Sequence, residues 1–165
     1  MEAAIWGLIG TVVGALASIG TTWLSNRSAH ILQSDRERLQ RLERENEFQR
    51  TTLIDLQEAI HDALRLIHKA YMHDVKAHRA AGSWAENSLP DEVDESARLA
   101  MRRVAILVER IESDSARQRV KSLMQIATAA MLANDPDEAE AKLNDAASSA
   151  TDVLEQIGSA LRARF

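Results

Sequence analysis

The pattern of apolar and polar residues divides the chain into three regions. Residues 3–26 carry no charged side chain, residues 27–52 are rich in Arg and Glu, and residues 53–165 repeat apolar residues at helical spacing. About 24 uncharged residues suffice to cross a bilayer as one helix. The pattern therefore predicts an all-α protein with a transmembrane anchor at 1–26, a charged helical stalk at 27–52 that could pair as a coiled coil, and a bundle at 53–165.

The third region contains four apolar stripes at three- and four-residue spacing. They consist of Leu53, Ile60, Leu64, Ile67, Tyr71 and Val75; of Val93, Ala97, Ala100, Val104, Leu107 and Ile111; of Val120, Leu123, Ala127 and Met131; and of Ala139, Leu143, Ala146, Ala150, Val153, Ile157 and Leu161. A helix with one apolar stripe needs partners to cover it. Four such stripes joined by short turns predict an antiparallel four-helix bundle.

Turn and capping residues mark the ends of these helices. Residues 135–138 read Asp-Pro-Asp-Glu, an acidic N-cap followed by Pro and a Glu at capping-box spacing. Ser113 and the segment Ser88–Asp91 are also predicted to begin helices. Gly82 is predicted to end one. These signals leave 82–89, which contains Trp84, as the one long connection.

Two other readings of residues 3–26 are a buried core helix and a cleaved signal peptide. Trp6 and Trp23 would sit about 25 Å apart in a helix, near the thickness of the hydrocarbon layer, which favours a span with aromatic anchors at both interfaces. The sequence Ala15-Leu16-Ala17 has the small-x-small form of a cleavage site. Only Met1 and Glu2 precede the apolar run, however, where a signal peptide needs basic residues.

One face of the predicted span consists of small residues, which let two helices approach closely in lipid. This proposed self-association face comprises Gly7, Gly10, Gly14, Ala17 and Thr21. The membrane-interface anchors are Trp6, Trp23 and Arg27. Arginines follow the span at 27, 36, 38, 41 and 44, and no basic residue precedes it, so the positive-inside rule predicts an external N terminus and a cytoplasmic bundle. The chain has no cysteine, so disulfide formation gives no independent check of the side of the membrane on which the bundle lies.

The stalk fits a heptad frame that continues into the bundle. The a positions are Leu32, Leu39, Asn46 and Leu53, and the d positions are Asp35, Leu42, Gln49 and Leu56. In a parallel dimer Arg38 would face Glu43, and Glu45 would face Arg50. Asn at an a position is typical of two-stranded coils, whereas Asp35 and Gln49 argue against one. The alternative is a single solvated helix with internal pairs such as Arg41 with Glu45.

Candidate chemistry is sparse. Glu58-x-x-His61 matches one half of the motif that holds di-iron centres in ferritin-like bundles, but a second copy is absent. The histidines at 68, 73 and 78 follow at five-residue steps, which place them on different faces, so we expect solvated histidines and no metal. Asp74 and His78 could form a local pair. No catalytic residue, cofactor site or phosphate loop is apparent, and the net charge of -5 does not favour nucleic acid.

The opening sequence AAIWGLIGTVVGA at 3–15, followed by Thr22-Trp23-Leu24 and an Arg/Glu-rich helix, resembles small single-pass membrane proteins of unknown function from actinobacterial and other bacterial genomes and their prophages. The resemblance covers the first third of the chain. It implies a bacterial inner-membrane location and no particular activity.

These observations predict a non-enzymatic, membrane-anchored interaction or scaffold module. It would self-associate through its span and stalk and present a cytoplasmic bundle to an unknown protein partner. The alternative is a membrane-active phage or host-defence effector, although the span offers few polar residues to line a pore. A spanin would require the bundle to lie outside, contrary to the arginine distribution.

Overall fold

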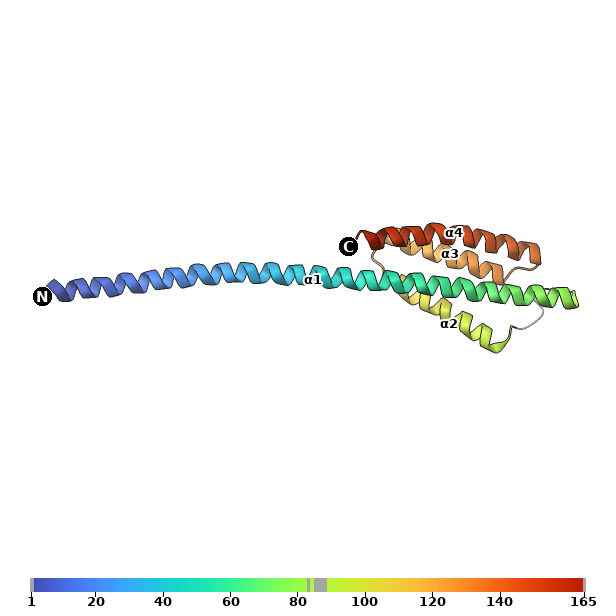
Figure 1. Ribbon diagram of the computed structural model, residues 1–165, viewed down its shortest axis with the longest axis horizontal. Helices are drawn as coiled ribbons and strands as arrows, with labels where there is room; N and C mark the ends of the chain where they lie inside the picture. The colour runs from blue at the N-terminus through green and yellow to red at the C-terminus, as the bar shows by residue number, and fades with distance from the viewer. Residues whose placement is uncertain (1, 83, 85–88, 165) are drawn as a thin grey trace. The chain divides into compact units, whose positions relative to one another are not determined.

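The computed structural model describes residues 2–82, 84 and 89–164, with side chains described for Gly14 and from Gln33 onward. Over these residues the chain forms four α-helices and no strand, which confirms the all-α prediction (Figure 1). The helices are α1 (Glu2–Ala81), α2 (Asp91–Val108), α3 (Asp114–Met131) and α4 (Pro136–Arg162). The chain divides into two compact units, residues 1–45 and 46–165.

The first unit consists of the N-terminal part of α1. Its described side chains from Gln33 to Glu45 are all exposed. Gln33 donates a hydrogen bond to Glu37 over 3.3 Å, and Glu37 lies 4.0 Å from the Arg41 guanidinium. Intrahelical pairs at i, i+4 therefore exist in this segment, but Arg41 pairs with Glu37 and not with Glu45.

The second unit is a helical bundle made from residues 46–81 of α1 together with α2, α3 and α4. Figure 1 shows these four segments running in alternating directions. Their apolar stripes meet in one core, which includes Leu56, Ile60 and Ile67 of α1, Val104 and Leu107 of α2, Val120 and Leu123 of α3, and Val153 and Ile157 of α4. The periodicity of the sequence thus identifies most of the core, while the stripe residues Leu64, Met131, Leu143 and Leu161 pack against it partly buried.

The predicted helix ends are largely confirmed. Ser113 caps α3 by accepting from the Ala116 amide over 3.3 Å, and Asp135 caps α4 by accepting from the Glu138 amide over 2.8 Å. In a capping box the Glu138 carboxylate would accept a hydrogen bond from the amide of the N-cap residue, Asp135. It accepts instead from the amide of the preceding residue, Asn134. Gly82 ends α1 with a φ of 75°, which glycine adopts without strain.

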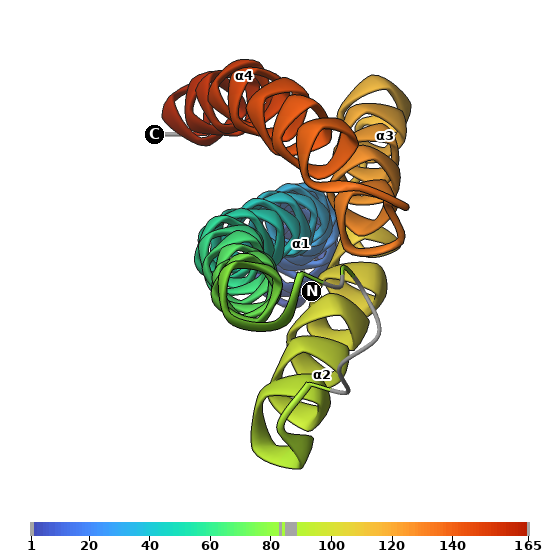
Figure 2. The ribbon, with the colours of Figure 1, turned by 90° about the vertical axis from the view of Figure 1, so that its right-hand side faces the viewer.

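Helix α2 packs less completely than the prediction of four covered stripes implies. Figures 1 and 2 both show its N-terminal part diverging from the other three helices. Val93 and Ala100, expected in the core, are only partly buried. Leu99 and Ile106 are 52% and 46% exposed. The helix is therefore attached mainly by its C-terminal half, where Val104, Leu107 and Val108 are buried.

Among the residues whose side chains the structure describes, no helix is long and apolar enough to cross a membrane. The predicted anchor at 1–26 lies outside those residues except for Gly14.

Candidate functional site

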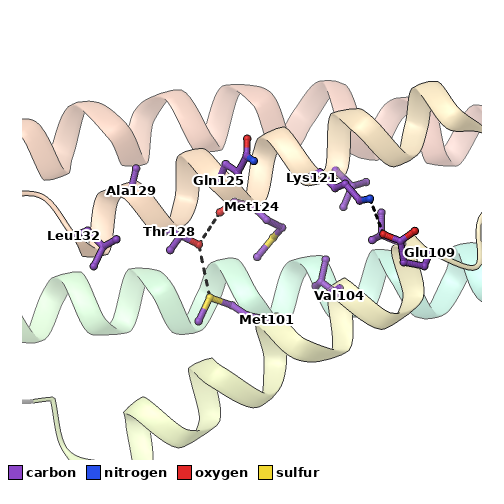
Figure 3. A pocket seen from close by; sticks show the side chains of 12 residues that line it. Met101, Val104, Glu109, Lys121, Met124, Gln125, Thr128, Ala129 and Leu132 are labelled. Carbon is purple, nitrogen blue, oxygen red and sulfur yellow. Dashed lines mark hydrogen bonds and ion pairs between the residues drawn. The ribbon is translucent and has the colours of Figure 1, made fainter.

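The clearest concave site in the bundle is a groove of about 490 Å³ between α2 and α3 (Figure 3). Its apolar lining consists of Met101, Val104, Ala105, Val108, Val120, Met124, Ala129 and Leu132. The groove exists because α2 diverges from α3, so the facing side chains do not interdigitate fully. Met101 and Met124 are unbranched and flexible, a type of residue that adapts to varied apolar surfaces.

Polar groups occupy defined places in this groove. At one end the Lys121 ammonium lies 2.6 Å from a Glu109 carboxylate oxygen. The hydrogen bond from Lys121 holds the pKa of Glu109 below its ordinary value, and the charges of Lys121 and Arg117 act in the same direction. Farther along, the Thr128 hydroxyl donates to the Met124 carbonyl over 2.7 Å. These polar groups therefore have partners within the chain, and most of the remaining lining is apolar.

A second groove, of about 580 Å³, lies between α1 and α4. It is lined by apolar residues such as Leu64, Tyr71 and Leu143 together with His68, Arg79 and Glu140. Its greater share of polar groups makes it a less favourable site for an apolar partner.

Trp84 joins two connections that lie at the same end of the bundle (Figure 1). Its indole N–H donates to the Ala133 carbonyl over 3.0 Å, and its ring packs edgewise against Tyr71 and His78, with centroids 6.1 and 5.9 Å away. This contact fastens the α1–α2 connection to the α3–α4 connection. The rest of the predicted long loop, residues 83 and 85–88, lies outside the described part of the chain.

Of the histidines predicted to be solvated, His68 is exposed as expected, whereas the other two differ. His73 and His78 are partly buried, and the Nδ1 atom of each is buried without a hydrogen-bond partner among the described residues. The expected Asp74–His78 pair does not form, because His78 packs against Trp84 while Asp74 lies 3.9 Å from His73. Burial raises the pKa of Asp74, and His73 opposes that shift.

The Glu58-x-x-His61 motif takes part in no metal cluster within the described residues. The Glu58 carboxylate instead lies 4.0 Å from Arg103 of α2. No group of three or more potential ligands was found among the residues that the structure describes.

Gln49, a d position of the predicted stalk, has a structural role that the heptad pattern does not predict. It is 8% exposed, and its side-chain amide donates to the Arg110 carbonyl over 3.0 Å and accepts from the Glu112 amide over 3.1 Å. Both backbone groups belong to the turn between α2 and α3, so one side chain attaches that turn to α1. The sequence carries one signal for this role, a polar residue at helical spacing from the apolar residues Leu53 and Leu56.

The predicted stalk residues fall on both sides of the unit boundary. Arg38, Leu39, Leu42, Glu43 and Glu45 belong to the first unit and are exposed. Asn46 accepts from Arg164 over 3.0 Å, and Arg50 pairs with Glu47 at 3.0 Å. Leu53 and Leu56, the next residues of the heptad frame, lie in the core of the bundle.

The predicted span residues have no described side chains apart from Gly14. Gly7, Gly10, Ala17, Thr21, Trp6, Trp23 and Arg27, and also Leu32 of the stalk, lie outside the described side chains. Gly14 is exposed, and no described atom lies within 4 Å of the position that a Cβ would take there.

Comparison with known protein families, with characterised proteins and with solved structures finds no match to this chain.

Proposed function

We propose that this protein is a non-enzymatic interaction module, anchored in a bacterial inner membrane by residues 1–26, whose cytoplasmic bundle binds a protein partner. The observation that carries the interaction role is the incomplete packing of α2. It leaves the apolar groove beside α3 uncovered, together with Leu132, which is 76% exposed. Large exposed apolar side chains around a groove are a common feature of protein-binding surfaces.

The groove supports binding in preference to chemistry. Its charged residues, Glu109 and Lys121, form an ion pair with each other at 2.6 Å, and its remaining lining is mostly apolar. A catalytic site would instead direct unpaired or activated polar groups toward a substrate.

The anchoring role is supported by the sequence and by the continuity of α1. Residues 3–26 carry no charge, and α1 is helical from Glu2 onward. A helix is one of the two backbone structures that can cross a bilayer, because its polar groups bond to one another. The arginines that follow residue 26 favour a cytoplasmic bundle.

Self-association through the span and stalk completes the proposal. Nothing described in the chain occupies the space next to Gly14, so a second helix could approach closely at this position. Leu39 and Leu42 are 60% and 48% exposed, which leaves these heptad positions available to a second chain. Because Gln49, Leu53 and Leu56 are buried in the bundle, we confine the parallel stalk contact to residues before Asn46.

The test uses the full chain in bacterial membranes. We expect it to resist alkaline extraction, and a reporter fused after Phe165 to be active in the cytoplasm. Gly14→Leu should be retained in the membrane but should self-associate less than the wild type in a membrane reporter assay, whereas Gly14→Ala should associate nearly normally. Release by alkali, or a reporter active only outside, would refute the anchored cytoplasmic module. Undiminished association of Gly14→Leu would remove the span interface.

A further inference from the structure

The outward side of α2 carries a basic and apolar surface that the proposed function does not use. A shallow cavity of about 390 Å³ lies there, and it is lined by Leu99, Arg102, Arg103, Ile106, Leu107 and Arg110, the last of which follows the end of the helix. Leu99 and Ile106 are 52% and 46% exposed. We call Leu99, Arg102, Arg103 and Ile106 the arginine face of α2.

The two arginines of this face have little compensating charge within the chain. Among the residues that the structure describes, Arg102 forms no ion pair. Arg103 lies 4.0 Å from Glu58 of α1, and ion pairs as exposed as this one contribute little. Glu95, also on the outward side of α2, accepts hydrogen bonds of 2.9 and 2.5 Å from Arg98 and is already neutralised by it. The arginine face is therefore suited to an acidic partner.

The outward side of α4 carries the opposite charge. Asp145, Ser148, Asp152, Glu155 and Ser159 follow one another at three- and four-residue steps, which place them on one side of a helix. All five are exposed, and none of the three carboxylates has an ion-pair partner within the described part of the chain. We call these five residues the acidic face of α4.

The two faces lie beside the same turn of α1. Figures 1 and 2 show α2 and α4 on opposite sides of α1. Arg103 lies near Glu58, and a Cβ placed on Gly158 would lie 3.9 Å from the Gln57 side-chain nitrogen. Glu155 precedes Gly158 by three residues, so it lies roughly 4.5 Å along the helix from this level. Long Arg and Glu side chains span such an offset.

We propose that the arginine face of α2 binds the acidic face of α4 in a neighbouring copy of the chain. Arg102 and Arg103 then meet Asp152 and Glu155 of that copy. The short serines of the acidic face leave room for the apolar side chains of the arginine face. Because the two faces differ, the contact is heterologous, and each copy keeps one face of each kind for a further neighbour.

The proposal rests on the anchoring of all copies in one membrane, and its geometry agrees with that anchoring. Copies anchored through the continuous helix α1 differ by a shift and a turn within the membrane plane, so their bundles stay parallel. The two faces of neighbouring parallel bundles then lie at matching levels. A two-fold contact between parallel copies through α2 would place arginine against arginine, and one through α4 would place carboxylate against carboxylate, which is repulsive.

Two other occupants match the arginine face less well. Anionic lipid surfaces are bound by clusters of about four to eight basic residues, whereas this cavity has three arginines. An unrelated acidic protein would have to compete with the acidic face of α4, which the neighbouring copies supply. Each exposed ion pair strengthens association by roughly 1.4- to 5-fold, so the contact depends on the high effective concentration of chains within a membrane.

The absence of native cysteine makes a direct test available. One full chain carries Ile106→Cys, a differently tagged one carries Ser159→Cys, and the two are reconstituted together in liposomes with a short bis-maleimide cross-linker. We expect cross-linked dimers that join the two tags, several-fold more abundant than dimers of like tags. In the control mixture Gln118→Cys, at an exposed position on α3, replaces Ile106→Cys. Cross-linking no greater than in the control, or mainly between like tags, would refute the contact.

A charge swap tests which residues meet. Arg102→Glu and Arg103→Glu are added to the first chain, and Asp152→Arg and Glu155→Arg to the second. Either altered chain mixed with its unaltered partner places like charges together, so we expect cross-linking to fall roughly 2- to 20-fold at low salt. Mixing the two altered chains should restore it. Circular dichroism checks that both remain helical, and undiminished cross-linking in both single mixtures would overturn the proposal.

Flotation of the liposomes separates the failure of this proposal from the failure of the anchoring. Chains that do not float refute the anchoring, and cross-linking of the concentrated chains in solution then decides the contact. Chains that float but do not cross-link refute the contact alone. If an environment-sensitive label at residue 106 is shielded only on vesicles rich in anionic lipid, without cross-linking, the arginine face binds lipid and the proposal is wrong.

Discussion

Helices α2 and α4 have similar sequence patterns but very different packing. Both show apolar residues at helical spacing, and both were expected to bury one full stripe. In α4 the buried residues are spread along the helix, from Ala139 near its start to Ile157 near its end. In α2 they are Ala97 and then Val104, Leu107 and Val108, and the N-terminal part of the helix diverges (Figure 2).

The facing side chains also differ in size. The buried residues of α4 include three alanines, and those of α3 also include three, at 116, 127 and 130. Small residues on both helices allow close approach along their whole length. Helix α2 instead presents Met101 to α3 and leaves Leu99 and Ile106 uncovered. Periodicity identifies which face of a helix turns inward, but it does not show how completely that face is covered.

The largest predicted effect contrasts one residue from each helix. Ile157 is 0% exposed, so Ile157→Ala should lower the free energy of unfolding by about 2–5 kcal/mol through lost burial and a cavity. Leu99 is 52% exposed, and Leu99→Ala should change it by about 0.5 kcal/mol or less. Chemical denaturation of the full chain, followed by circular dichroism at low protein concentration, measures both. A Leu99→Ala cost similar to that of Ile157→Ala would show that α2 is packed as completely as α4.

The next effect concerns the attachment of α2 at its C-terminal end. Gln49→Leu would leave the Arg110 carbonyl and the Glu112 amide without their side-chain partner, at a cost of about 1–3 kcal/mol. Gln118→Leu on the exposed side of α3 is the control and should cost little. If the attachment of α2 depends on the hydrogen bonds of Gln49, then in Gln49→Leu the exchange of backbone amide hydrogens should accelerate more in α2 than in α4. Uniform acceleration across the bundle would mean that Gln49 stabilises the fold without specifically fastening α2.

Much of the fold was predictable because its signals are local. The caps at Ser113 and Asp135, the stop at Gly82 and the apolar stripe of α4 each depend on residues within a few positions of one another. The predicted alternation of helix directions also followed from short connections between similar helices.

The site was less predictable because it depends on contacts between residues far apart in sequence. Gln49 binds a turn about 60 residues away, and Trp84 binds Ala133. The groove lies between two helices that do not pack along their full length, and the side chains that line it meet only in the folded bundle. No pattern within α2 alone distinguishes a covered stripe from an uncovered one.

The smallest predicted effect tests the polar end of the groove between α2 and α3. The hydrogen bond from Lys121 holds the pKa of Glu109 below its ordinary value of 4.5, so folding favours the ionised carboxylate. This contribution to stability is present above pH 4.5 and is lost as the pH falls through the lower pKa of the folded state. Lys121→Gln should therefore reduce the acid-dependent loss of stability below pH 4.5, while Lys76→Gln on the exposed side of α1 should not. Denaturation midpoints measured from pH 3 to pH 7 test this, and identical curves for Lys121→Gln and the wild type would show that the pair does not link α2 to α3 in solution.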